Sequence, residues 1–260
     1  MSRAEIKISL DAVKSTFHRT LSLLQNKTNI SPTESIEWKR LQDHLNSSNR
    51  LIDLGCGSNP HPKAKVSVDK FLKPIHRNLG YGSELNKHGF QEKKLHFVQA
   101  DLEALPFANK TFDFAYSHHA FEHLPNPKKA CSEICRIANR GAIITPSIFT
   151  EIAFGRPYHL WFVLSRGNKL FFIRKMPHED RPFGEHPIPK NNGGYRVTEK
   201  TNPFDILLNQ GNWYHGMERM PRLSRLLRNL LYSHSPVHKV IFLWEGSFNC
   251  VVIHQDGSIE

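Results

Sequence analysis

Hydrophobic residues follow a helical period at the start of this chain. Apolar residues three or four apart between Leu10 and Leu24 predict a first helix, and the capping box at residues 31–34 predicts a second helix that runs to about Leu45. We therefore expect residues 1–49 to form a helical N-terminal cap. Residues 50–260 would then form the main domain.

From residue 50 onward, short apolar runs alternate with polar turns, and this pattern predicts strands. A turn at Glu245-Gly246 between two apolar runs predicts a hairpin near the end of the chain. A helix is expected from about Asn126 to Gly141. The expected strands are residues 51–54, 65–69, 95–102, 112–117, 142–144, 239–244 and 248–253.

The first predicted strand runs into a glycine turn that is typical of a ligand site. A backbone that passes close to a bulky ligand favours Gly55 and Gly57, because glycine adopts a positive φ without steric cost. Asp53 stands near the carboxyl end of this strand, where open α/β sheets bind ligands. A dinucleotide-binding turn would continue to a third glycine that opens a helix. Pro60 and Pro62 follow here instead, so NAD is disfavoured.

Two further acidic residues mark the ends of the next predicted strands. Asp69 ends the second strand, a position from which an acid can bind both hydroxyls of a ribose. Asp101 lies at the end of the third strand. We therefore expect three acids and the glycine turn to converge on one edge of the sheet.

Four stretches of the sequence carry a family resemblance: LIDLGCGSNP, VSVDKF, VQADLEALPFANKTFDFAYSHHAFEHL and ACSEICRIANRGAIITPS. Over roughly residues 50–150 the chain resembles the class I S-adenosylmethionine-dependent methyltransferases, in particular the methyltransferase type 11 subgroup. The resemblance implies a Rossmann-like, mostly parallel α/β sheet with an antiparallel C-terminal hairpin, and S-adenosyl-L-methionine as cofactor. Only eleven residues separate Gly57 from Asp69, so the helix usual in the family must be absent or vestigial there.

The resemblance also implies a set of cofactor-binding residues at the strand ends. The glycine turn would line the methionine part, Asp69 would hold the ribose hydroxyls, and Asp101 with the backbone of Leu102 would read the adenine. Ser117 and His118 would face the sulfonium. The full set is Asp53, Gly55, Cys56, Gly57, Asp69, Asp101, Leu102, Ser117 and His118.

Methyl transfer from a sulfonium is an in-line displacement in which the protein mainly positions the nucleophile and excludes water. A hydroxyl acceptor also needs a proton acceptor, and histidine suits that task near neutral pH. His119, just beyond the fourth strand, is the first candidate for this general base and His159 is the second. We expect O-methylation of a small-molecule or glycan-like acceptor, without a metal ion.

A competing motif overlaps the first candidate base. Residues 119–123 fit the H-x-x-E-H pattern of inverted zinc metallopeptidases, with His119 and His123 as ligands and Glu122 as general base. That chemistry needs a regular helix around the motif, whereas a strand precedes it and Pro125 follows it. A zinc hydrolase is therefore a remote alternative.

The positive charge of the chain gathers in the part that least resembles the family. Residues 147–238 are expected to be an inserted substrate cover, and residues 151–240 carry 14 Lys and Arg against 7 Asp and Glu, out of a net charge of +11. Arginines spaced three apart predict a basic amphipathic helix at residues 221–231. An anionic acceptor or a peripheral membrane contact would suit that charge. RNA is a less favoured partner, because no RNA-binding module is recognisable.

The remaining alternatives concern location and catalysis. The four cysteines lack paired metal-ligand spacing, and no apolar run approaches the roughly 20 residues needed to cross a bilayer, so we expect a cytoplasmic protein. An RNA methyltransferase and a cofactor-binding protein without catalysis both remain compatible with the sequence.

Overall fold

The computed structural model describes residues 35–57, 59–70, 96–154, 158–175, 188–189, 195–196 and 237–260. Three sequence predictions therefore lie wholly or largely outside the described residues. They are the first helix of the N-terminal cap, the basic helix at residues 221–231, and most of the substrate cover at residues 147–238.

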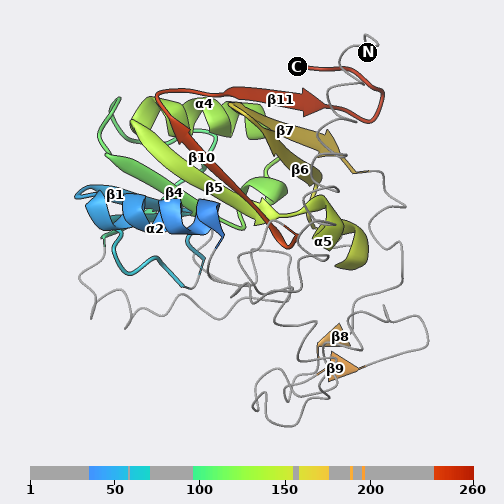
Figure 1. Cartoon of the computed structure of the whole chain (residues 1–260), viewed down its shortest axis with the longest axis horizontal. Helices are drawn as coiled ribbons and strands as arrows, with labels where there is room; N and C mark the ends of the chain where they lie inside the picture. The colour runs from blue at the N-terminus through green and yellow to red at the C-terminus, as the bar shows by residue number, and fades with distance from the viewer. Residues whose placement is uncertain are drawn as a thin grey trace.

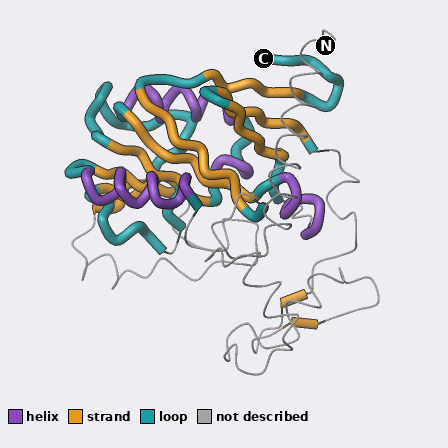
Figure 2. The backbone as a smooth tube through the Cα atoms, viewed as in Figure 1, coloured by secondary structure: helices purple, strands orange, loops and turns teal. Residues whose placement is uncertain are grey.

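A six-stranded sheet forms the centre of the described fold (Figures 1 and 2). Its spatial order is β10-β5-β4-β1-β2-β3, and every neighbouring pair is parallel except β10 with β5. This arrangement confirms the predicted Rossmann-like α/β class. The strands are β1 (Leu51–Leu54), β2 (Val66–Asp69), β3 (His96–Gln99), β4 (Phe114–His118), β5 (Arg140–Pro146) and β10 (Lys239–Glu245).

Side chains alternate between the two faces of this sheet, as the period of a strand requires. Helix α2 (Ile36–Ser47) buries Leu41 and Leu45 against one face, and helix α4 (Pro127–Ile137) buries Ile134 and Ile137 against the other. The central strands are therefore buried on both faces, which explains their nearly continuous apolar sequence.

The two helices differ in how well the sequence predicted their starts. Asn126 caps α4 by accepting a hydrogen bond from the Lys129 backbone N–H at 2.9 Å, as expected. Helix α2 begins at Ile36, after the predicted capping box, and Ser35 caps it by accepting a hydrogen bond from the Trp38 N–H at 3.1 Å. The capping box predicted at residues 31–34 lies outside the described residues.

A second sheet corrects the predicted C-terminal hairpin. Strands β6 (Trp161–Arg166) and β7 (Lys169–Arg174) are antiparallel, and β11 (Asn249–Ile253) pairs with β7 in parallel. The two predicted hairpin strands, β10 and β11, therefore belong to different sheets and do not pair. Gly246, at φ +70°, donates its N–H to the Asn139 carbonyl at 2.7 Å. This contact ties the turn to the segment between α4 and β5, and β11 runs across α4 instead of folding back on β10 (Figure 1).

Shorter elements complete the described chain. A 3-10 turn, η2 (Phe121–His123), follows β4, and helix α5 (Ile148–Phe154) follows β5. Two-residue strands β8 (Ile188–Pro189) and β9 (Tyr195–Arg196) pair with each other. Among the described residues, no helix is both long enough and apolar enough to cross a membrane.

Candidate functional site

The glycine turn after β1 has the backbone conformation that the sequence predicted. Gly55 and Gly57 have φ angles of +72° and +59°, in the left-handed region that favours glycine. A Cβ on Gly55 would lie only 2.4 Å from the Cβ of Ala120. The turn therefore packs directly against the segment that leads into η2.

Asp53 is a buried carboxylate at the carboxyl end of β1. Its Oδ2 accepts a hydrogen bond from the His61 backbone N–H at 2.7 Å. Burial raises the pKa of Asp53 to about 7, with a further contribution from the negative charge of Asp69, while the His61 N–H acts in the opposite direction. A cationic group brought close to this carboxylate would favour its ionised form.

Of the other two acids, Asp69 is the last residue of β2 and Asp101 lies two residues after the end of β3. Asp69 Oδ2 accepts the Gly57 N–H at 2.9 Å, which links the second strand to the glycine turn. Asp101 pairs with Lys70 at 2.7 Å and accepts the Glu103 N–H at 3.0 Å. These bonds lower the pKa of Asp101, although partial burial opposes the shift. We call Asp53, Gly55, Gly57, Asp69 and Asp101 the cofactor edge, after the cofactor that the sequence resemblance predicts there.

The remaining predicted cofactor residues surround this edge. Cys56 and Leu102 are buried beside the turn. The buried Ser117 Oγ donates to the Leu54 carbonyl at 2.8 Å and so joins β4 to β1. The His118 Nε2 lies 2.9 Å from the Nζ of Lys239, at the start of β10.

Lys239 is a site residue that sequence reasoning missed. Burial lowers the pKa of Lys239 to about 8, although the charge of Glu122 acts in the opposite direction. Lys239 lies in a strand whose sequence shows no functional motif, so only its contact with His118 in the structure places it at the site. The ring of His118 stacks in turn on that of His119, with centroids 4.4 Å apart.

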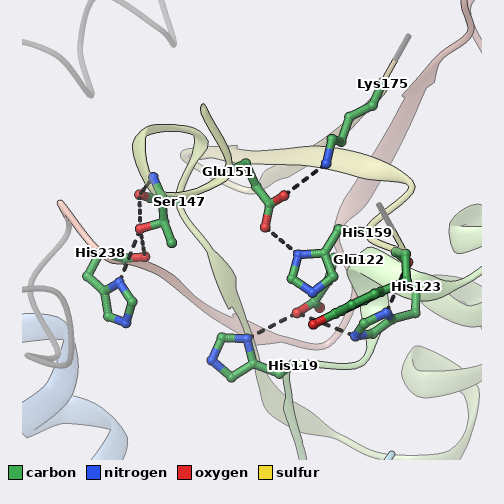
Figure 3. Close-up of polar contacts among 10 residues, drawn as sticks. His119, Glu122, His123, Ser147, Glu151, His159, Lys175 and His238 are labelled. Atoms are coloured by element: carbon green, nitrogen blue, oxygen red, sulfur yellow. Dashed lines mark hydrogen bonds and ion pairs between the residues drawn. The ribbon is translucent and has the colours of Figure 1, made fainter. Parts of the chain in front are cut away.

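His119 and Glu122 form a hydrogen-bonded pair at the end of β4 (Figure 3). The Nδ1 of His119 lies 3.0 Å from Oε1 of Glu122, and the backbone of His119 has a φ of +58°. The His119 side chain is 38% exposed, whereas that of Glu122 is fully buried. Burial alone would raise the pKa of Glu122, but the His119 hydrogen bond and the nearby imidazoles lower it to about 2.

A second carboxylate holds the other candidate base. His159 is buried, and its Nδ1 is hydrogen-bonded to Oε1 of Glu151 from α5. The Nζ of Lys175, just after β7, donates to Oε2 of the same carboxylate at 3.1 Å. The sequence did not single out Glu151 or Lys175, because they lie 24 positions apart and in different elements. We call the buried residues Glu122, Glu151, His159 and Lys175, together with the exposed His119 that binds Glu122, the buried network (Figure 3).

The structure lacks the regular helix that the zinc-hydrolase alternative requires around residues 119–123. Residues 121–123 form a single 3-10 turn, and His119 lies before it with a positive φ, so the motif does not stand on one regular helix. His123 instead turns its Nδ1 toward the Tyr158 carbonyl, 3.2 Å away. Its ring also packs edge-on against His159, with centroids 4.6 Å apart.

Comparison with known proteins finds a family match within the first sheet. Residues 52–145 match the Methyltransf_11 family model, described as a methyltransferase domain. The chain is 26% identical over 163 residues to a demethylmenaquinone methyltransferase of Renibacterium salmoninarum, covering 60% of this chain and 66% of that protein. It is 28% identical over 125 residues to an O-methyltransferase of Pyrenophora dematioidea, covering 43% of this chain and 46% of that protein.

Other similarities are more partial. A cycloartenol-C-24-methyltransferase of Arabidopsis thaliana is 28% identical over 105 residues, which cover 39% of this chain and 31% of that protein. Among solved structures, an S-adenosylmethionine-dependent methyltransferase of Mesorhizobium loti aligns with a TM-score of 0.35 and 18% identity, over 55% of this chain and 66% of that one. The chain thus spans less than two thirds of the length of these relatives, and the two names that specify an acceptor specify different ones.

Proposed function

We propose that this protein, which carries a methyltransferase type 11 domain of the class I S-adenosylmethionine-dependent methyltransferases at residues 52–145, methylates a hydroxyl oxygen of a small-molecule or glycan-like acceptor. The cofactor of this enzyme family is S-adenosyl-L-methionine, and it supplies an activated methyl group. The domain implies a methyl acceptor, and the identity of that acceptor is the open part of the proposal.

The cofactor edge fits such a cofactor chemically. The glycine turn has the positive-φ backbone that a loop close to a ligand favours, and the buried Asp53 can compensate the positive charge of an amino group. Asp69 would hold the ribose hydroxyls, and Asp101 with the backbone of Leu102 would contact the adenine. Ser117 and His118, at the carboxyl end of β4, would lie next to the reacting end of the cofactor.

The His119–Glu122 pair is the observation that carries the proposed chemistry. A buried carboxylate that holds one ring nitrogen of a histidine orients the ring and supports the charge that the ring gains with a proton. His119 is partly exposed, so its Nε2 can receive the proton of an acceptor hydroxyl. The acceptor oxygen then bonds to the methyl carbon as the carbon–sulfur bond breaks, and the bonding pair stays on the thioether sulfur of the product.

His159 is less suited to be the base. Its ring is buried and its Nδ1 is already bound to Glu151, which Lys175 holds in turn. A proton taken up there would have to leave through the protein interior. We therefore assign the proton transfer to His119 and a positioning role to His159.

Substitution of His119 tests the proposed chemistry. His119→Ala should lower kcat by about 100- to 10,000-fold, the usual contribution of a general base, without changing the affinity for S-adenosylmethionine. The measurement is transfer of a labelled methyl group to fractionated cell extract, with calorimetric titration of the cofactor in parallel. His254→Gln is the matched control, because His254 also pairs with a glutamate but lies near the C-terminus. Equal turnover by His119→Ala and the native protein would reject His119 as the base.

The same assay separates the competing functions. Label in the RNA fraction, together with salt-dependent RNA binding, would replace the small-molecule acceptor by RNA. Cofactor binding without transfer to any fraction would indicate a binding protein without catalysis. A cytoplasmic location and a membrane contact through residues 221–231 remain proposals that rest on charge and composition.

A further inference from the structure

We propose that Glu122, His123 and His159 bind one divalent transition-metal ion, such as Zn²⁺, which holds the acceptor hydroxyl. The three side chains come from the turn after β4 and from the segment after α5 (Figure 3). One potential ligand atom from each lies within 4.8 Å of the other two. Two imidazoles and one carboxylate are the ligands of many catalytic zinc sites, which keep a further position open for water or substrate.

The first independent observation in favour of a bound cation is an oxygen of Glu122 that has no hydrogen-bond partner among the described residues. Its side chain is fully buried, and Oε1 is hydrogen-bonded to His119. Oε2 is buried too, yet it has no hydrogen-bond partner among the described residues. A buried carboxylate oxygen without a partner is costly and rare, and a cation bound by this carboxylate, whose Oε1 lies 4.0 Å from Nε2 of His123, would remove that cost.

The two histidines supply the second sign, because each is held through the ring nitrogen that a metal would not use. His123 has its Nδ1 against the Tyr158 carbonyl at 3.2 Å, and His159 has its Nδ1 against the Glu151 carboxylate. Both acceptors require a proton on Nδ1, which leaves the lone pair on Nε2. Metal-binding histidines characteristically donate their second nitrogen to a carbonyl or a carboxylate in this way.

Glu151 and Lys175 complete this support without competing for the ion. The Nζ of Lys175 binds the oxygen of Glu151 that does not contact His159, so the charge of the carboxylate is balanced inside the protein. This arrangement explains why a lysine and a glutamate are buried behind a histidine that is itself 8% exposed.

The separation of the potential ligands is compatible with a site that closes on its ion. Tetrahedral zinc with bonds of about 2.0–2.2 Å would bring these ligand atoms to roughly 3.3 Å from one another. The present maximum of 4.8 Å requires side-chain movements of about an ångström. Nitrogen-rich donor sets favour zinc, cobalt or iron over magnesium and calcium, which prefer oxygen ligands.

The ion would lower the pKa of a hydroxyl bound at its open position. His119 shares Glu122 with the ion, so the base that receives the hydroxyl proton stands beside it. The methyl carbon then passes from sulfur to the metal-bound oxygen, and the neutral thioether leaves. This catalytic role rests on the proposed methyl transfer, whereas metal binding does not.

Metal binding can be measured on the full chain, without a histidine tag and after treatment with a chelator. Equilibrium dialysis should find one Zn²⁺ or Co²⁺ per chain and much weaker Mg²⁺ binding, and bound Co²⁺ should show the visible absorption of a tetrahedral or five-coordinate site. Glu122→Gln and His159→Gln should each weaken binding by about 100-fold or more. His254→Gln, which breaks an exposed histidine–glutamate pair of 3.1 Å, should leave it unchanged.

The outcomes separate this inference from the proposed function. If the native chain binds S-adenosylmethionine but takes up no metal, the metal site is wrong and the methyltransferase proposal stands. If the native chain binds metal but not S-adenosylmethionine, the metal site stands and the methyltransferase proposal is wrong. Unchanged Zn²⁺ affinity in folded Glu122→Gln and His159→Gln chains would also overturn the site, as would an equal loss in His254→Gln.

Discussion

Asp101 of the cofactor edge and Glu151 of the buried network each pair with a lysine, and the two pairs differ in their surroundings more than in their length. Lys70 and Asp101 are 2.7 Å apart, with side chains 53% and 36% exposed. Lys175 and Glu151 are 3.1 Å apart, with side chains 2% and 1% exposed. The shorter pair lies in water and the longer one in the protein interior, so distance alone is a poor guide to their energetic importance.

The two regions also satisfy their carboxylates differently. At the cofactor edge, Asp53, Asp69 and Asp101 each accept a backbone N–H. In the buried network, Glu122 and Glu151 are bound by side chains alone among the described contacts. A substitution leaves a backbone N–H donor in place, whereas a single substitution can remove a side-chain donor. The buried network should therefore respond far more strongly to single substitutions.

The largest expected effect is on stability, in the buried network. Lys175→Met leaves the Glu151 charge without its cation and should lower the free energy of unfolding by about 3–5 kcal/mol. Denaturant unfolding followed by circular dichroism measures the change. The double variant with Glu151→Gln should recover part of the loss, because the uncompensated charge is gone. A loss below about 1 kcal/mol for Lys175→Met would show that water reaches this pair.

A pH-dependent effect is expected at Asp53 in the cofactor edge. Its folded pKa of about 7 lies above the unfolded value of 3.8, so the native state holds the proton more tightly. Its contribution to stability is present below pH 3.8 and is lost as the pH rises towards about 7. Asp53→Asn should therefore gain stability relative to the native chain by about 1.4 kcal/mol per pH unit in that window.

A matched control for Asp53 has the opposite sign. Arg50 lowers the pKa of the exposed Asp113, so the contribution of that pair is present above the unfolded pKa and is lost in acid. Asp113→Asn should thus lose a little stability at neutral pH. A flat difference between native and Asp53→Asn unfolding curves across pH 4 to 7 would contradict the raised pKa of Asp53.

The smallest expected effect is at Lys70. Lys70→Met removes an exposed pair and should cost about 0.2–1 kcal/mol of unfolding free energy, with a smaller cost at high salt. The same unfolding experiment compares it directly with Lys175→Met. A cost for Lys70→Met as large as that for Lys175→Met would remove the distinction between the two regions.

Local patterns predicted most of the central fold and the positions of the cofactor acids. Local features explain these positions: Asp69 ends β2, Asp101 follows β3 by two residues, and the glycines at positive φ and the Asn126 cap depend on near neighbours. Parallel strands then bring their carboxyl ends to one edge without further information. The choice of residues that bind the cofactor there stays a prediction.

The sequence did not predict which strands distant along the chain would pair. The apolar run and the preceding turn predicted a hairpin strand at residues 248–253; the strand forms at Asn249–Ile253, but it pairs with β7 and not with β10. Glu151, His159 and Lys175 carry no common motif, because side chains from separate elements meet only after the sheets have packed. The sequence by itself determined the strands and their end residues, through local sterics and hydrophobic period. Only the tertiary structure decided which buried charges face each other, because burial makes a charge depend on whichever partner the packing brings within reach.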